Sequence, residues 1–173
     1  MTPARLRLAI ISGAGVLVLL WFLWWSGTAV QADRTFARLQ SAIEQGRAGA
    51  VLDNLHRDYD IKASWPNQLG GEAADFTDGI SAPTMRLLVL RGLTGLFQLQ
   101  SSDPFVFRYT IARIEAQDDG TVAVTVSIGL STTSGHRPLT FTPPLTNQRF
   151  VLARDGWWPA LYVRGHPAFS VVY

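Results

Sequence analysis

The segment that most constrains this chain is residues 8–25, LAIISGAGVLVLLWFLWW, an uninterrupted run of 18 uncharged residues. At about 1.5 Å per residue, a helix of this length is roughly 27 Å long, close to the hydrocarbon thickness of a bilayer. Arg5 and Arg7 precede the run, and the first acidic residue is Asp33. The pattern predicts a tip at residues 1–7 and a transmembrane helix at residues 8–25.

The aromatic residues Trp21, Phe22, Trp24 and Trp25 close this run. Aromatic side chains gather where a membrane helix meets the headgroups, and basic residues stay on the cytoplasmic side. We therefore expect a retained anchor in a bacterial inner membrane, with a cytoplasmic N-terminus and the remaining chain periplasmic or extracellular. The alternative is a signal peptide cleaved after Ala32, where Val30-Gln31-Ala32 supplies small residues at the required spacing.

Small residues lie near the start of the predicted membrane helix, at Ser12, Gly13 and Gly15. Such residues allow a second helix to approach closely within lipid. They are candidates for a helix–helix contact.

The remainder of the chain is electrically neutral. Setting aside Arg5 and Arg7 leaves 13 basic residues against 13 acidic ones, so a nucleic-acid partner is not expected. Cysteine is absent, which excludes disulfides and thiolate chemistry. The three histidines have no metal-ligand spacing, so we expect neither a metal nor another cofactor.

Three helices are expected after a linker at residues 26–33, within one domain at residues 34–173. Apolar residues recur every three or four positions from residue 33 to 46, with Asp33 as the N-cap. A second helix begins at Val51 and ends near Tyr59, followed by a long loop. Ser81, with Pro83 in the first turn, starts the third.

After residue 104 the pattern changes from helical to alternating. Strands are expected at residues 105–112, 122–130, 149–154 and 157–163, and Asp118, Asp119 and Gly120 form a hairpin turn between the first two. Pro159 indicates that the last strand lies at an edge or starts after the proline. Residues 131–148 are expected to be a loop or a ragged edge of the sheet, and residues 166–173 an apolar tail. This order predicts an α+β domain with helices on one face of a curved antiparallel sheet.

These elements resemble the nuclear transport factor 2-like superfamily, also called cystatin-like or SnoaL-like. Residues 33–46 and 51–59 resemble its opening helix pair, which closes on an acidic-aromatic step, here Asp58-Tyr59. Residues 111–130 resemble its central hairpin, and RFVLARDGWW at residues 149–158 resembles its last one. The resemblance implies a cone of three helices packed on a curved antiparallel sheet. It implies little about function, because the superfold contains enzymes, transport adaptors and assembly domains.

Enzymes of this superfamily place proton-transfer residues in an apolar pocket inside the cone. The resemblance therefore makes Asp58, Tyr59 and Asp60 the catalytic candidates. A carboxyl in such a pocket would have a raised pKa and could act as a general base. The reading that we favour is that Asp58 and Asp60 are solvated at a helix end and that Tyr59 belongs to the core.

The family's usual histidine has no counterpart in the sequence pattern. His136 lies in the expected loop, His166 in the tail, and His56 on the expected exposed face of the second helix. We therefore predict that the domain is not an enzyme.

Aromatic residues crowd the long loop and the C-terminal part, and such residues often anchor protein interfaces. The candidates for a partner surface are Trp65, Trp157, Trp158, Tyr162, Phe169 and Tyr173. The leading prediction is a single-pass membrane protein that acts as an accessory, assembly or scaffold subunit, with the lipid bilayer and other membrane-protein subunits as partners. The alternative is a membrane-tethered small-molecule-binding protein or SnoaL-like enzyme that uses the cone pocket.

Overall fold

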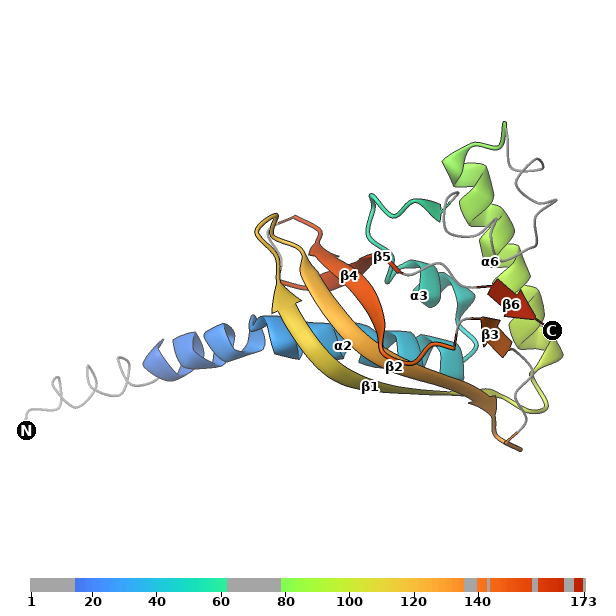
Figure 1. Ribbon diagram of the computed structural model, residues 1–173, viewed down its shortest axis with the longest axis horizontal. Coiled ribbons are helices and arrows are strands. Elements are labelled where there is room, and N and C mark those ends of the chain that lie inside the picture. Colours follow the sequence, from blue (N-terminus) through green and yellow to red (C-terminus); the bar gives the residue numbers. More distant parts are fainter. Residues whose placement is uncertain are drawn as a thin grey trace, which may run out of the picture.

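The computed structural model describes residues 15–61, 79–135, 140–142, 144–156, 159–166 and 170–172 (Figure 1). A helix at Gly15–Trp25 comes first. The helices α2, α3 and α6 span Thr28–Glu44, Ala48–Leu52 and Ala82–Leu99. The strands are β1 (Phe105–Ala116), β2 (Val122–Thr132), β3 (Thr140–Thr142), β4 (Gln148–Arg154), β5 (Leu161–Gly165) and β6 (Ser170–Val172). The expected α+β class is confirmed.

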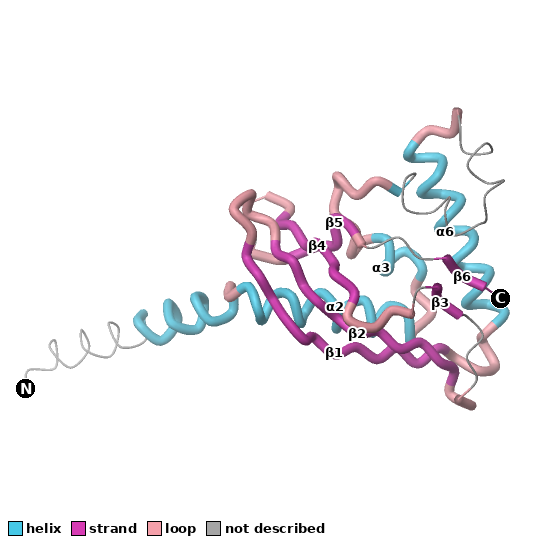
Figure 2. Tube along the Cα trace, in the orientation of Figure 1, coloured by secondary structure: helices cyan, strands magenta, loops and turns pink. Residues whose placement is uncertain are grey.

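The main sheet is antiparallel and curved, with strand order β1-β2-β4-β5 (Figure 2). The predicted hairpin turn between β1 and β2 is confirmed, and Gly120 adopts the positive φ of 79° that such a turn requires. β5 lies at the edge and begins after Pro159, as predicted. The register of β1 shifts between Ile111 and Arg113, where a bulge bends the strand.

A second, two-stranded sheet pairs β3 with β6. The sequence pattern predicts a loop and a tail at these places. A strand of three residues is too short to show an alternation of apolar and polar residues, so these two strands are recognised only by their pairing with each other.

The helices cover one side of the main sheet. α2 packs on β1 and β5, α3 packs on α2, and α6 packs on α3. The core between α2 and the sheet is formed by Ala32, Phe36, Val122, Val124, Val126, Phe150, Leu152, Leu161 and Val163. Thr35, which is fully buried, donates from Oγ1 to the Leu161 carbonyl at 2.8 Å and so fixes α2 to the edge strand. A smaller cluster of Leu52, Ile61, Met85 and Val89 joins α3 to α6.

Two predicted helix boundaries are wrong. α2 begins at Thr28 with Gly27 as its N-cap, so most of the predicted linker is helical and Asp33 is not a cap. The Asp33 carboxylate instead accepts a hydrogen bond from the Tyr109 hydroxyl at 2.9 Å. The third helix does start as predicted, because the Ser81 hydroxyl accepts from the Thr84 N–H.

The second helix is shorter than expected, because α3 ends at Leu52. The following residues leave the helix to pair with the edge strand β5. Leu55 forms a parallel bridge with Val163, whose N–H donates to the Asn54 carbonyl at 2.9 Å.

The predicted transmembrane segment is described only in part, since residues 8–14 lie outside the described residues. Among those described, no single helix has the length and apolar character needed to cross a bilayer. The helix Gly15–Trp25 and α2 meet that requirement only as a pair, and they are bent by 61°.

Candidate ligand site

Tyr59 and His166 form a hydrogen-bonded pair at the edge of the main sheet. The Tyr59 hydroxyl lies 2.5 Å from Nε2 of His166, and the two ring centroids are 5.6 Å apart. Tyr59 follows α3, whereas His166 directly follows β5. The bridge between Leu55 and Val163 brings the two segments together. The pair therefore depends on the tertiary fold and not on proximity in sequence.

Aromatic rings extend from this pair into the core. The Phe150 ring lies 6.2 Å from that of His166 and meets Phe36 edge-on at 5.7 Å. Tyr109 lies beside Phe36 at 5.6 Å. Tyr59 and His166 are both half-buried. A phenol and an imidazole are thus placed against an aromatic wall.

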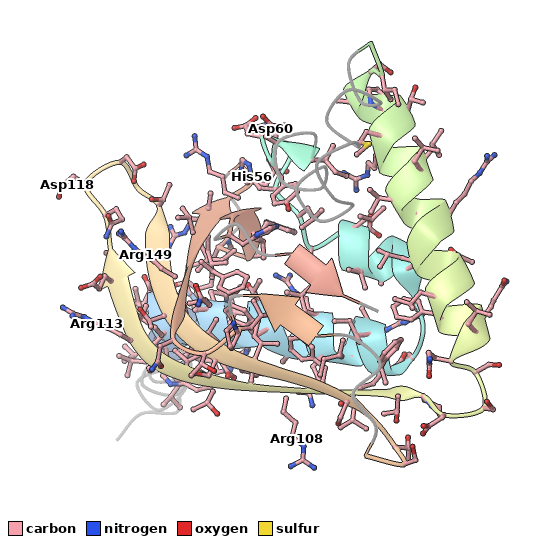
Figure 3. All side chains as sticks on the ribbon, turned by 45° about the vertical axis from the view of Figure 1, so that its right-hand side comes forward. His56, Asp60, Arg108, Arg113, Asp118 and Arg149 are labelled. Carbon is pink, nitrogen blue, oxygen red and sulfur yellow. The ribbon has the colours of Figure 1, made fainter. Side chains whose placement is uncertain are left out.

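The carboxylates next to Tyr59 lie at the surface. The Asp58 side chain is 61% exposed, and Asp60 is also exposed (Figure 3). A raised carboxyl pKa requires an apolar environment, which Asp58 does not have. Of the three catalytic candidates from the sequence, only Tyr59 contacts the core clusters.

The prediction that His56 is exposed is wrong. Its side chain is 5% exposed because the shortened helix turns it inward (Figure 3). Nε2 lies 3.0 Å from the Arg154 carbonyl, and Nδ1 accepts from the Asp58 N–H at 3.1 Å. A carbonyl can only accept and an N–H can only donate, so the neutral imidazole with its proton on Nε2 satisfies both. His56 is therefore a structural residue.

The sequence pattern offers no histidine partner for Tyr59, and the structure supplies His166. No local motif marks this residue. The register of β5 against residues 54–56 is the signal that would have revealed it.

The remaining candidates are divided between described and undescribed residues. Trp21, Phe22 and Trp24 are exposed on the helix Gly15–Trp25, whereas Trp25 lies beneath the Arg34 guanidinium at 4.8 Å. Gly15 lies on the same helix. Tyr162 is half-buried, with the Arg38 guanidinium 5.1 Å from its ring. The other candidates, Ser12, Gly13, Trp65, Trp157, Trp158, Phe169 and Tyr173, lie outside the described residues, as does His136.

The described part of the chain contains no cluster of three or more histidine, aspartate or glutamate side chains that could hold a metal ion.

No protein-family model matches this chain, and no curated protein matches it. Among solved structures it is similar to Aln2 from a Streptomyces species, with 13% identity over 83% of this chain and 88% of that chain, and a TM-score of 0.51. Two structures from Catenulispora acidiphila also match over 83% of this chain. One has 16% identity, 89% coverage of that chain and a TM-score of 0.46. The other, in complex with S-DNPA, has 14% identity, 92% coverage of that chain and a TM-score of 0.45.

Of these three TM-scores, only that for Aln2 exceeds 0.5, and at 13% identity this likeness concerns the fold alone. The likeness to Aln2, together with the packing of helices on the curved sheet, fits the cone fold that the resemblance implies. The likeness to Aln2 concerns the overall fold, which in this chain is a curved antiparallel sheet with helices on one face.

Proposed function

We propose that this protein is a membrane-tethered small-molecule-binding protein whose ligand contacts Tyr59 and His166 at the edge of the main sheet. The observation that carries the proposal is the hydrogen bond between these two side chains, half-buried beside Phe150. Ligand sites are typically apolar and aromatic, with a few convergent polar groups that set orientation.

The chemistry of the pair indicates the class of ligand. Tyrosine can donate or accept through its hydroxyl, and a neutral imidazole has one donor and one acceptor nitrogen. A planar apolar molecule with one hydroxyl or carbonyl group could pack on Phe150 and hydrogen-bond to the pair. The same two groups could exchange a proton with a bound carbonyl compound, so any turnover would depend on them.

The test is a calorimetric titration of the full-length protein in detergent with 2-naphthol, using empty micelles as the blank. We expect saturable binding that Tyr59→Phe and His166→Gln each weaken about 5–10-fold, the loss of roughly one hydrogen bond. Tyr162→Phe is the matched control, because it also removes one tyrosine hydroxyl. Tyr162 lies on the edge strand β5, where its ring contacts Arg38 of α2. Equal weakening by all three variants, or no saturable binding to the folded protein, would contradict the proposal.

The tether rests on the helix Gly15–Trp25. All nine side chains from Val16 to Trp24 are exposed, from 46% for Phe22 to 68% for Leu17. A helix that is apolar on every side requires an apolar environment. We infer that this environment is a bilayer, with Arg5 and Arg7 on the cytoplasmic side of a bacterial inner membrane.

A second candidate is the accessory subunit, which binds other membrane proteins. What favours it is the row of rings at Tyr109, Phe36 and Phe150, which fills part of the cone with the protein's own side chains. A pull-down in mild detergent distinguishes the two functions. Stoichiometric membrane-protein partners would favour the subunit, and recovery of a monomer that binds 2-naphthol would favour the ligand-binding protein.

A further inference from the structure

Two helix C-termini meet at a pocket that is separate from the Tyr59–His166 pair. α2 ends at Glu44 and α6 at Leu99, and these two helix ends lie near the start of β1 (Figure 1). Residues at these three places line an open pocket of about 420 Å³. The residues that define its chemistry are Glu44, Gln45, Phe97, Gln98, Gln100 and Phe105. None of them belongs to the site described above.

The electrostatics of this pocket favour a positive charge. A long helix carries about half a negative charge at its C-terminus, and proteins often place basic residues there to balance it. α2 and α6 have 17 and 18 residues, and neither has a basic residue in its last turn. Among the described residues that line the pocket there is no basic side chain, and Glu44 adds a full negative charge. Arg47, close along the chain, is exposed and outside the lining.

The Glu44 carboxylate is held in place. Its Oε1 accepts a hydrogen bond from the Gln40 amide at 3.1 Å and lies 3.3 Å from the Phe107 N–H. Glu44 is exposed, so its charge is accessible from the pocket.

Two aromatic rings complete the pocket. The Phe97 and Phe105 centroids are 6.0 Å apart, with the rings inclined at 69°. Aromatic faces attract cations, and most strongly those that are weakly hydrated, such as quaternary ammonium groups. Gln45, Gln98 and Gln100 also line the pocket, and the dipoles of their side-chain amides can turn a partly negative oxygen toward a cation.

We propose that this pocket binds a small organic cation with an ammonium group, of the size of choline. A pocket of about 420 Å³ has room for such a molecule. A metal ion is disfavoured, because calcium requires six to eight oxygen ligands and the pocket has one carboxylate among its described residues. The C-terminal ends of α2 and α6 lie at the opposite end of the molecule from the helix Gly15–Trp25 (Figure 1). Because the pocket is lined by residues at these two helix ends, the cation is a free molecule and not a lipid headgroup.

The test compares choline with 3,3-dimethylbutanol, a neutral molecule of the same shape, by titration calorimetry on the full-length protein. We expect saturable choline binding and at least about tenfold weaker binding of the alcohol. Glu44→Gln should weaken choline binding about 5–10-fold, and Phe97→Leu about fivefold. Circular dichroism establishes that each variant is folded.

The matched control is Asp118→Asn, which also removes one negative charge. Asp118 is exposed at the β1–β2 turn, at the other end of the sheet (Figure 3). Its substitution should leave choline binding unchanged. Equal affinities for choline and the alcohol, absence of saturable choline binding, or equal weakening by Asp118→Asn and Glu44→Gln would overturn the proposal. These outcomes do not depend on 2-naphthol binding at Tyr59 and His166.

Discussion

At the scale of single residues, the His56 side chain joins the segment after α3 to the end of β4 through its hydrogen bond with the Arg154 carbonyl, and it accepts a second, local hydrogen bond from the Asp58 N–H. His56→Leu leaves the Arg154 carbonyl and the Asp58 N–H without these partners. We expect a loss of about 2–3 kcal/mol in the free energy of unfolding, measured by urea denaturation. Arg57→Ala is the control, because Arg57 is 68% exposed and forms a surface ion pair with Asp155. A smaller loss for His56→Leu than for Arg57→Ala would contradict this role.

Tyr109 makes the stability of the fold dependent on pH in the alkaline range. Burial, followed by the hydrogen bond to Asp33 and that residue's negative charge, raises the pKa of Tyr109 from 10.0 to about 12. A raised pKa means that the folded state holds the proton more tightly than the unfolded state. The contribution to stability is therefore complete below pH 10 and is lost as the pH rises through about 12.

The measurement is urea denaturation of the wild type and of Tyr109→Phe across this range. The wild-type advantage should shrink between pH 10 and 12. Asp33→Asn removes the negative charge, so tyrosinate absorbance should then rise at lower pH than in the wild type. A constant difference between the wild type and Tyr109→Phe would show that this tyrosine does not contribute to the pH dependence.

At the scale of elements, the bend between the helix Gly15–Trp25 and α2 is held by specific contacts. Gln31 is 2% exposed and donates from Nε2 to the Trp25 carbonyl at 2.6 Å, and Arg34 covers the Trp25 ring. A Cβ on Gly27 would lie 3.0 Å from the Trp24 carbonyl oxygen, which favours glycine there. The junction is therefore a fixed bend and not a flexible linker.

Spin labels can measure this bend, because the chain has no native cysteine. With labels at Leu20→Cys and Asp118→Cys, we expect a narrow distance distribution that Gln31→Ala broadens. Gln40→Ala removes a hydrogen bond to Glu44 within α2 and should leave the distribution narrow. A wild-type distribution as broad as that of Gln31→Ala would indicate a flexible junction.

Elements with a clear period can be predicted from the sequence, and the others cannot. The sequences of β1 and β2 alternate between apolar and polar or small residues, and α6 has both a Ser81 cap and an early proline. The sequence pattern places the start of α2 too late, because Asp33 is a residue type that often caps helices. In the structure the bend at Gly27 separates the two helices, and α2 begins directly after it. The sequence pattern also does not reveal His166 as a partner of Tyr59, because the two residues meet only through the bridge between Leu55 and Val163.

At the scale of the whole molecule, the proposed membrane tether predicts that the protein resists extraction from the membrane. We expect the full-length protein to stay in the membrane pellet after alkaline carbonate treatment. The double variant Leu17→Asp with Leu20→Asp should release it, because each buried carboxylate costs about 2.5–3.5 kcal/mol at the centre of a membrane helix. The control is the double variant Leu87→Asp with Leu88→Asp on the exposed face of α6, which should leave the protein in the membrane pellet. Release of the wild type would argue against the tether.

The central claim is that a small molecule contacts the Tyr59–His166 pair, and imidazole nitrogen NMR tests it most directly. The chain has three histidines, so the His166 signals can be assigned by their loss in His166→Gln. Titration of the full-length protein with 2-naphthol should shift the His166 nitrogens saturably, with about 5–10-fold weaker binding in Tyr59→Phe. His166 signals that do not move, or a titration that Tyr59→Phe leaves unchanged, would contradict the claim.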